Sequence, residues 1–310
     1  MTTSHLLRAL LYPATVAVVS FQPFAAPTAD ANAPAPQQAE WQAVETAIGR
    51  PGVSQPGGVY RFNFPRTDLR VMIGDVQLKP ALALGGWVAF NSSGANAVAV
   101  GDLVLLETEV NPVIDALQAG GVEQSAIHHH VLRESPRIIY MHVHGHGDAV
   151  KIARAVHAAV ARTAIPAPAA PAAAPTSAAE FGIDTAAIAK TLGYAGRVNG
   201  GVYQVGVPRA ESVRDEGMEL PPSMGLSTSI NFQPTGAGKA AITGDFVMLA
   251  SEVNPVIRAL RAGGIEITSL HSHMLNEEPR LLFMHFWAND DAVKLARGLR
   301  SALDKTNSKR

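Results

Sequence analysis

The 310-residue sequence contains no cysteine, few aromatic residues (6%) and few charged residues (16%). Without thiols, disulfides, thiolate metal sites and a cysteine nucleophile are excluded, so any metal ion must be bound by His, Asp or Glu. The net charge is −1 and the Lys and Arg residues are scattered. With no basic stripe, we expect no nucleic-acid partner. Hydrophobic residues make up 47% of the chain, which is enough to form cores.

The N-terminus lacks an apolar run long enough to span a membrane. His5 and Arg8 accompany an apolar stretch over residues 6–19, and Ala29 and Ala31 fit a small-x-small cleavage site. This pattern predicts a signal peptide over residues 1–31 and a periplasmic or secreted mature protein. The alternative is an amphipathic N-terminal helix. No cysteine follows the apolar stretch, so we do not expect a lipoprotein.

An internal duplication organises the rest of the chain. Residues 101–154 and 244–297 align without a gap, and 30 of these 54 positions are identical. The repeat predicts two similar modules, at residues 40–163 and 181–304. We expect residues 32–39 to be flexible, residues 164–180 to form an extended Ala/Pro-rich linker, and residues 305–310 to be a tail.

Each module is predicted to begin with a helix, continue with strands, and end as β-α-β-β-α. The first helix is expected over residues 40–48. Asn111 and Asn254, each followed by proline, predict the N-caps of the middle helices, and Gly120 and Gly263 predict left-handed C-terminal residues. Closing helices are expected over residues 148–161 and 290–303. The fold class is therefore α+β, with a mostly antiparallel sheet in each module.

Histidines recur at the same place in both modules. We interpret them as metal ligands, three to a module: His128, His130, His142, His271, His273 and His285. Residues two apart on a strand share a face. An odd-length loop places His142 on the face of His128 and His130, whereas an even-length loop places it on the opposite face. The odd loop is favoured because it leaves the other face of the second hairpin apolar.

A pocket is predicted around each set of histidines. In the second module Phe283 and Trp287 would form its aromatic wall. In the first module His144 and His146 are candidate catalytic bases, since an imidazole beside a metal ion can accept a proton near neutral pH. Glu109 and Glu252 are candidate carboxylate ligands, or else they stabilise the helix N-termini that follow them.

Three neutral imidazoles suit zinc, copper, nickel or iron, and zinc is the first candidate for the cofactor. A non-metal histidine pocket or a structural cluster is the alternative. The function we predict is metal binding, extending to a metal-dependent hydrolase that acts on a small molecule. The alternatives are a non-catalytic ligand- or metal-binding envelope protein and a structural protein whose histidines brace the hairpins.

Several motifs resemble those of the bacterial LppY/LpqO family. They are residues 244–247 (GDFV), 252–255 (EVNP), 271–273 (HSH), 278–280 (EPR) and 284–288 (MHFWA). The resemblance covers nearly all of the expected mature chain in both modules. It implies an exported or lipid-anchored protein, but no reaction. That family typically has Asn between the paired histidines, whereas this chain has His129 and Ser272, so we do not expect that position to be a ligand.

Overall fold

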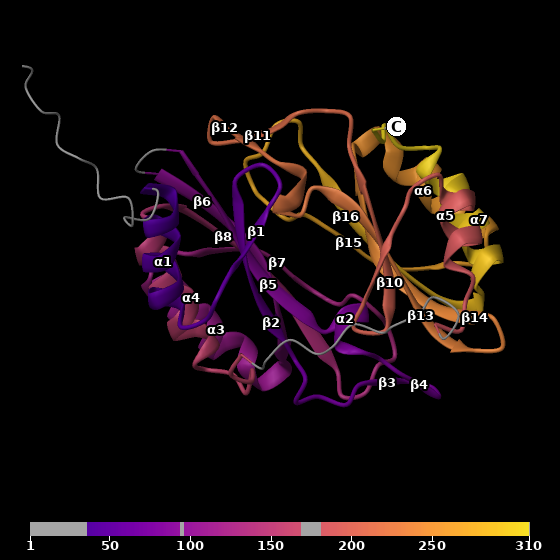
Figure 1. Cartoon of the computed structure of the whole chain (residues 1–310), viewed down its shortest axis with the longest axis horizontal. Helices are drawn as coiled ribbons and strands as arrows, with labels where there is room; N and C mark the ends of the chain where they lie inside the picture. Colours follow the sequence, from indigo (N-terminus) through magenta and orange to yellow (C-terminus); the bar gives the residue numbers. More distant parts are fainter. Residues whose placement is uncertain (1–35, 94–95, 169–180, 310) are drawn as a thin grey trace, which may run out of the picture.

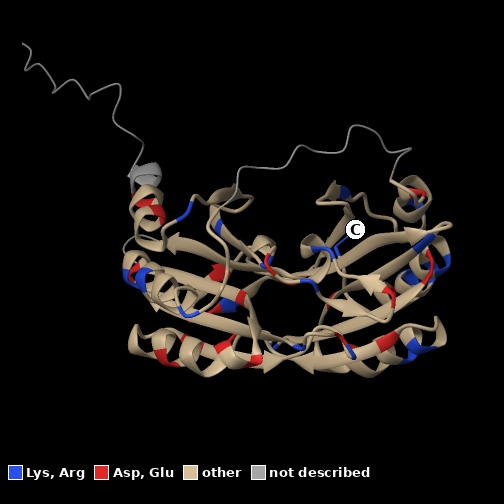
Figure 2. Cartoon of the chain, turned by 90° about the horizontal axis from the view of Figure 1, so that it is seen from below, with Lys and Arg blue, Asp and Glu red and all other residues tan. Residues whose placement is uncertain are grey.

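The computed structural model describes residues 36–93, 96–168 and 181–309. The predicted signal peptide at 1–31 and most of the predicted linker, residues 169–180, lie outside the described residues. Within the described residues, no helix is long and apolar enough to cross a membrane. Acidic and basic side chains are interspersed over both halves of the molecule (Figure 2).

Two modules of the same architecture follow one another along the chain (Figure 1). The first comprises α1 (Pro36–Ile48), β1 (Val53–Gln55), β2 (Val59–Pro65), β3 (Met72–Ile73), β4 (Val76–Gln77), α2 (Pro80–Ala83), β5 (Gly85–Ser93), β6 (Asn96–Leu106), η1 (Glu107–Glu109), α3 (Val110–Ala119), β7 (Glu123–His128), β8 (Ile138–Gly147) and α4 (Ala149–Val160). The second comprises α5 (Thr185–Leu192), β9 (Arg197–Asn199), β10 (Val202–Pro208), β11 (Val213–Asp215), β12 (Met218–Leu220), η3 (Pro222–Met224), β13 (Ser227–Gly236), β14 (Lys239–Met248), α6 (Ala250–Ala262), β15 (Glu266–His271), β16 (Leu282–Asp291) and α7 (Ala292–Leu303).

Each module is built on a six-stranded antiparallel sheet. The strand orders are β1-β2-β5-β6-β8-β7 and β9-β10-β13-β14-β16-β15, so the two sheets have the same topology. In both sheets the histidine hairpin, β7–β8 or β15–β16, lies at one edge. These features confirm the predicted α+β fold and the internal duplication.

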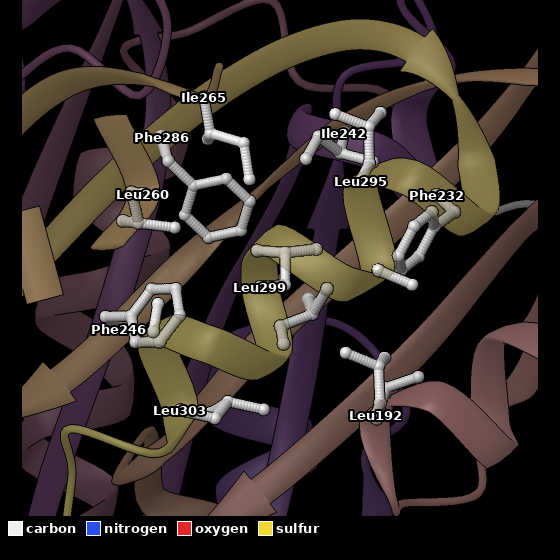
Figure 3. Packing of buried hydrophobic residues seen from close by; sticks show 14 of the residues in the cluster. Leu192, Phe232, Ile242, Phe246, Leu260, Ile265, Phe286, Leu295, Leu299 and Leu303 are labelled. Atoms are coloured by element: carbon white, nitrogen blue, oxygen red, sulfur yellow. The ribbon is translucent and has the colours of Figure 1, made fainter. Parts of the chain in front are cut away.

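The long helices of each module cover the outer face of its sheet. Figure 1 shows α1, α3 and α4 on one side of the molecule and α5, α6 and α7 on the opposite side, with the two sheets between them. Phe246 and Phe286 point outward from the second sheet and pack against Leu260, Leu295 and Leu299 of the helices (Figure 3). The first module has an equivalent core under its own helices. The inner faces of the sheets are thus left to face each other.

Two apolar clusters join these inner faces. In one, Val98 and Val100 of the first sheet contact Met224 and Leu226 from the segment after β12. In the other, Leu78 and the helix α2 of the first module contact residues of the second sheet that include Trp287. Each module therefore packs the segment around its short hairpin, β3–β4 or β11–β12, on the sheet of the other module. The buried side chains of these clusters exclude water from the parts of the interface that they fill.

The middle helices begin earlier than the sequence predicts. Leu249, not Asn254, is the N-cap of α6, and Pro255 lies within the helix. In the first module Glu109 is the N-cap of α3, not Asn111. The early starts arise because Glu109 and Glu252 turn back to accept the backbone N–H of the residue three positions before them, at 2.8 Å.

Other local predictions also need correction. The left-handed glycines after these helices are Gly121 and Gly264, with φ of 77° and 75°, rather than the preceding glycines. Residues 36–39, predicted to be flexible, form the first turn of α1. The closing helix of the second module is capped by Asp291, one residue later than predicted. In the predicted tail, Ser308 pairs with Arg209, so the segment up to residue 309 lies against the module.

The packing between the sheets predicts that the two halves remain associated when the chain is cut between them. A specific protease site inserted between Ala172 and Ala173 would separate the modules covalently. We expect the cut halves to co-elute as one particle in size-exclusion chromatography with light scattering, because separation would expose both inner faces. A cut Val100→Asp variant, with a charge in the interface, should separate more readily. Independent elution of the unmodified halves would contradict this packing.

Candidate metal centre

Strand register brings the histidines of each hairpin to one face. In the first module His128 pairs with Tyr140 and His142 pairs with Ala126, across a β-bulge between Gln124 and Ala126. Because directly paired residues share a face, His142 lies on the face of His128. This matches the same-face alternative from the sequence, but His142 is diagonal to His128 rather than opposite it. The second hairpin repeats the register, with His271 paired to Phe283.

The face that carries the histidines is the inner face, so the two hairpins bring their imidazoles together between the modules. We call the six residues the histidine cluster: His128, His130, His142, His271, His273 and His285. The Nε2 atoms of His128 and His285 are 3.2 Å apart, although the residues are 157 positions apart in the chain. The ring centroids of His128 and His271 are separated by 3.9 Å. The sequence predicted one pocket in each module, whereas the structure has one shared centre.

A pseudo-two-fold arrangement relates the two halves of the cluster. The distance between the ring centroids of His130 and His285 is 3.8 Å, and the equivalent distance between His142 and His273 is 3.9 Å. The cluster is closed at both ends by an aromatic ring. Tyr140 stacks on His130 at 3.4 Å, and Phe283 stacks on His273 at 3.5 Å, again between centroids. The symmetry follows from the duplication, since equivalent residues occupy equivalent places.

Backbone carbonyls orient one imidazole from each module. The Nδ1 of His142 lies 3.2 Å from the carbonyl oxygen of Gly101, and that of His285 lies 2.7 Å from the carbonyl of Gly244. A ring that donates Nδ1–H to a carbonyl keeps its lone pair on Nε2, which is the arrangement that outer-shell partners impose on metal-bound histidines. The Nε2 of His142 has no hydrogen-bond partner among the described residues.

Two aspartates, Asp102 buried and Asp245 largely buried, border the histidine cluster, and the sequence reasoning missed both. Asp102 and Asp245 lie on β6 and β14, each directly paired with the histidine of the neighbouring strand. The Oδ2 of Asp102 is 3.2 Å from the Nε2 of His130, and the Oδ2 of Asp245 is 2.9 Å from the Nε2 of His273. The sequence does contain a signal for them. A Gly-Asp pair within an apolar strand recurs at the same place in both modules.

The interior position of the cluster favours uncharged imidazoles. Burial lowers the pKa of His130 to about 3 and that of His285 to about 4, and neighbouring histidines add to both shifts. Burial likewise holds the pKa values of His128, His142 and His271 well below their usual range. Neutral imidazole is the form that binds a metal ion.

The two carboxylates respond differently to this environment. Burial raises the pKa of Asp102 to about 7. Burial also opposes ionisation of Asp245, but the adjacent imidazoles of His285 and His273 outweigh it and hold the pKa of Asp245 below its usual value. Of the two carboxyl groups, Asp245 therefore ionises more readily than Asp102.

Three overlapping groups of histidines have ligand atoms close enough together to hold one metal ion. They are His128 with His271 and His285, His128 with His130 and His142, and His142 with His271 and His273. Within each group the ligand nitrogens all lie within 4.8 Å of one another. Metal–nitrogen bonds to zinc are about 2.1 Å long, so small side-chain rotations converge such a group on one ion. All three predicted ligands of each module therefore lie in the shared centre.

His144 and His146, the predicted catalytic bases, contact the second module outside the histidine cluster. The Nε2 of His144 is 2.6 Å from the Oδ2 of buried Asp215, and the Nδ1 of His146 is 3.3 Å from Glu216. Burial opposes protonation of His144, but the bond to Asp215 raises its pKa above the usual value. The Nε2 of His144 is thus engaged by Asp215, and this contact links the two modules.

Trp287 occupies the equivalent of the His144 position in the second module. It packs in the apolar cluster with Val71 and Leu82 of the first module rather than against the imidazoles. Of the two predicted wall residues, only Phe283 stacks on a ligand histidine. One end of the interface thus has an ion pair where the other end has apolar packing. This asymmetry does not extend to the ligand histidines.

Glu109 and Glu252 do not reach the histidine cluster. Each forms an ion pair with a buried arginine, Glu109 with Arg66 at 2.6 Å and Glu252 with Arg209 at 2.7 Å. These pairs, together with the backbone bonds described above, attach β2 and β10 to the helix starts. The predicted role as metal ligands is therefore replaced by the structural alternative.

The residues between the paired histidines also lie outside the cluster. The Nδ1 of His129 is 2.8 Å from the carbonyl of Ile138, and its Nε2 contacts Arg137 at 3.1 Å. Ser272 donates to the carbonyl of Ser125 across the modules. Neither is part of the metal-binding groups. The expectation that this position is not a ligand agrees with the geometry.

Comparison with protein families matches both modules to one family. Its model, described as Domain of Unknown Function (DUF1259), matches residues 42–162 and 186–305. The chain belongs to this DUF1259 family. Two matches along one chain agree with the two modules of the fold. No curated protein matches.

Solved structures with some similarity are shell proteins of bacterial microcompartments. The trimeric shell protein PduB has 11% identity and a TM-score of 0.20, with 81% of this chain and 88% of that chain covered. EtuB from Clostridium kluyveri has 11% identity and a TM-score of 0.18, covering 82% and 90%. The double-ringed trimeric shell protein MSM0271 from the RMM microcompartment has 11% identity and a TM-score of 0.20, covering 68% and 84%. Scores this low carry no argument about fold or assembly.

The buried neutral imidazoles predict that the metal-free protein is sensitive to acid. A histidine in the unfolded chain has a pKa of about 6.5, whereas burial lowers the pKa of His285 in the folded protein to about 4. Lowering the pH through this window therefore favours unfolding. We expect the free energy of unfolding to decrease by about 1.4 kcal/mol per pH unit for each such imidazole.

Urea unfolding of the metal-free protein between pH 7.5 and 5 measures this slope. His285→Phe removes one proton-binding group and should make the slope shallower. His146→Gln, at a half-exposed residue outside the cluster, is the matched control and should leave the slope largely unchanged. A free energy of unfolding that is independent of pH over this range would show that the cluster histidines are not held neutral.

Proposed function

We propose that this chain is a transition-metal-binding protein whose metal centre is shared by its two modules. The observation that carries the proposal is the convergence of six largely buried imidazoles, several of whose ring nitrogens lack protein partners. Unpartnered nitrogens among the described residues include Nδ1 of His128, Nε2 of His142 and both nitrogens of His271. A buried polar atom without a partner costs about 1–3 kcal/mol, so a cluster of them is unfavourable unless a ligand satisfies them.

The donor set limits which metals fit. Imidazoles with flanking carboxylates suit zinc, nickel, iron or copper, and the absence of thiolates disfavours soft ions such as cuprous copper. Zinc is our first choice because it accepts three imidazoles and one further ligand in a tetrahedral arrangement. The oriented Nδ1 atoms of His142 and His285 further support binding through Nε2.

The proposal is tested with protein purified without a histidine tag. We expect zinc to co-purify or to bind with a dissociation constant of micromolar or tighter. At a zinc concentration about 100 times the dissociation constant, the protein should be stabilised by about 2.7 kcal/mol. Elemental analysis and isothermal titration measure the content and the affinity, and denaturant unfolding measures the stabilisation.

His285→Ala removes an oriented ligand and should weaken or abolish zinc binding. His157→Ala is the matched control, because His157 contacts the carbonyl of Ile48 on the helical side of the first module. It should bind zinc as the unmodified protein does. Less than about 0.2 ions per chain after reconstitution with zinc, copper, nickel and iron would refute the proposal.

A hydrolytic role is a second candidate, favoured by the two aspartates at the cluster. Their Oδ1 atoms are buried and have no hydrogen-bond partner among the described residues. A metal-bound water molecule needs such an acceptor for its proton. Turnover of activated esters by the zinc-loaded protein, lost in Asp102→Asn without loss of zinc, would support a hydrolase. Zinc binding without turnover supports a non-catalytic metal-binding protein.

Export to the periplasm or outside the cell remains part of the proposal, as does membership of the LppY/LpqO family. The apolar stretch over residues 6–19 and the small residues around Ala31 support export. Mass spectrometry of the protein expressed at full length in a bacterial host is the test. A mature N-terminus at or near Asn32 is expected, and an intact first residue in the cytoplasmic fraction would contradict export.

A further inference from the structure

The histidine cluster contains more ligands than one ion uses. Zinc takes four ligands in structural sites, and three protein ligands in catalytic sites. Six imidazoles and two carboxylates therefore amount to two ligand sets. The pseudo-two-fold relation divides them into equal halves, because each histidine of one hairpin has an equivalent in the other.

Two divisions of the ligands obey this symmetry and keep the paired histidines of each hairpin together. In the within-module division, each ion is bound by the three histidines of one hairpin. In the crossed division, each ion is bound by the paired histidines of one hairpin and by the strand histidine of the other. The crossed sets are His142 with His271 and His273, and His285 with His128 and His130.

Interatomic distances favour the crossed division. The strand histidine of the other module stacks closely on the second histidine of each pair, with 3.8 Å between the rings of His130 and His285 and 3.9 Å between those of His273 and His142. The first histidine of each pair does not distinguish the divisions, since the ring of His128 is 5.0 Å from that of His142 and 5.2 Å from that of His285. In addition, the Nε2 atoms of His128 and His285 are 3.2 Å apart, near the spacing of about 3.4 Å for two ligands of a tetrahedral ion with 2.1 Å bonds.

Each carboxylate approaches one of the paired histidines, so it can complete the ligand set in either division. Asp245 approaches His273, so it lies beside the set that contains His142, His271 and His273. Asp102 approaches His130 and lies beside the set that contains His285. Each set then has three imidazoles and one carboxylate, which completes four-coordination for a divalent ion.

We propose that the cluster holds two divalent transition-metal ions, each bound by two histidines of one module, one histidine of the other, and an aspartate. This inference rests on the proposed function and adds the number of ions and the division of ligands. Both ions then bridge the modules, so that metal binding joins the two halves of the chain. In the within-module division neither ion would do so.

Double variants distinguish the two divisions with equal numbers of histidines removed. In the crossed division, His130→Ala with His285→Ala disables a single site, so one cobalt ion per chain should still bind. His130→Ala with His142→Ala damages both sites, so cobalt binding should fall to near zero. The within-module division predicts the opposite pair of results. Cobalt(II) titration followed by visible absorption measures the stoichiometry, and circular dichroism verifies the fold.

The unmodified protein supplies a second readout that does not depend on the folding of variants. Copper(II) titrated into the protein should bind at two ions per chain. Two ions within one cluster interact magnetically, so the isolated-ion paramagnetic resonance signal should decrease as the second equivalent binds. One copper ion per chain with an undiminished signal overturns this inference while leaving the proposed function intact. Absence of binding by any metal refutes the proposed function itself.

Discussion

The contact between the inner faces of the two sheets is the interaction on which the rest of the structure depends. Each sheet buries its outer face under the long helices of its own module, which leave its inner face to the other module. Packing the modules face to face buries apolar surface that would otherwise be exposed to water. The histidines lie on this same face, so the contact that completes the core also assembles the metal centre.

Water exclusion explains the chemistry of the centre. Imidazoles between two sheets remain neutral because charge is costly in a buried environment, and neutral rings keep a lone pair for a metal ion. Asp245 lies where it could balance the charge of a cation, and the carbonyls of Gly101 and Gly244 fix the orientation of two rings. The same burial makes unpartnered ring nitrogens expensive, which is why a bound ion accounts for the arrangement better than a bracing role.

Much of the architecture is predictable from the sequence, because local patterns specify local structure. The ungapped repeat predicts two copies of one fold. Residue alternation leaves two faces open for His142, and the apolar face of the second hairpin favours the one that His142 shares with His128, as observed. Predictions were wrong where a side chain competes with a local signal. Asn111 and Asn254 look like N-caps, but Glu109 and Glu252 bond to earlier backbone groups and extend the helical start. The contact of His144 with Asp215, 71 positions away in the sequence, could not be read from local patterns either.

By itself, the sequence determined the duplication, the fold class of each module and the candidate ligand histidines, since these depend on spacing and alternation within one hairpin. Only the tertiary structure decided that the two sets form one centre and that Asp102 and Asp245 belong to it. The physical reason is that the inner face of each sheet is completed by the other module. No periodicity within a strand specifies which surface will cover that face.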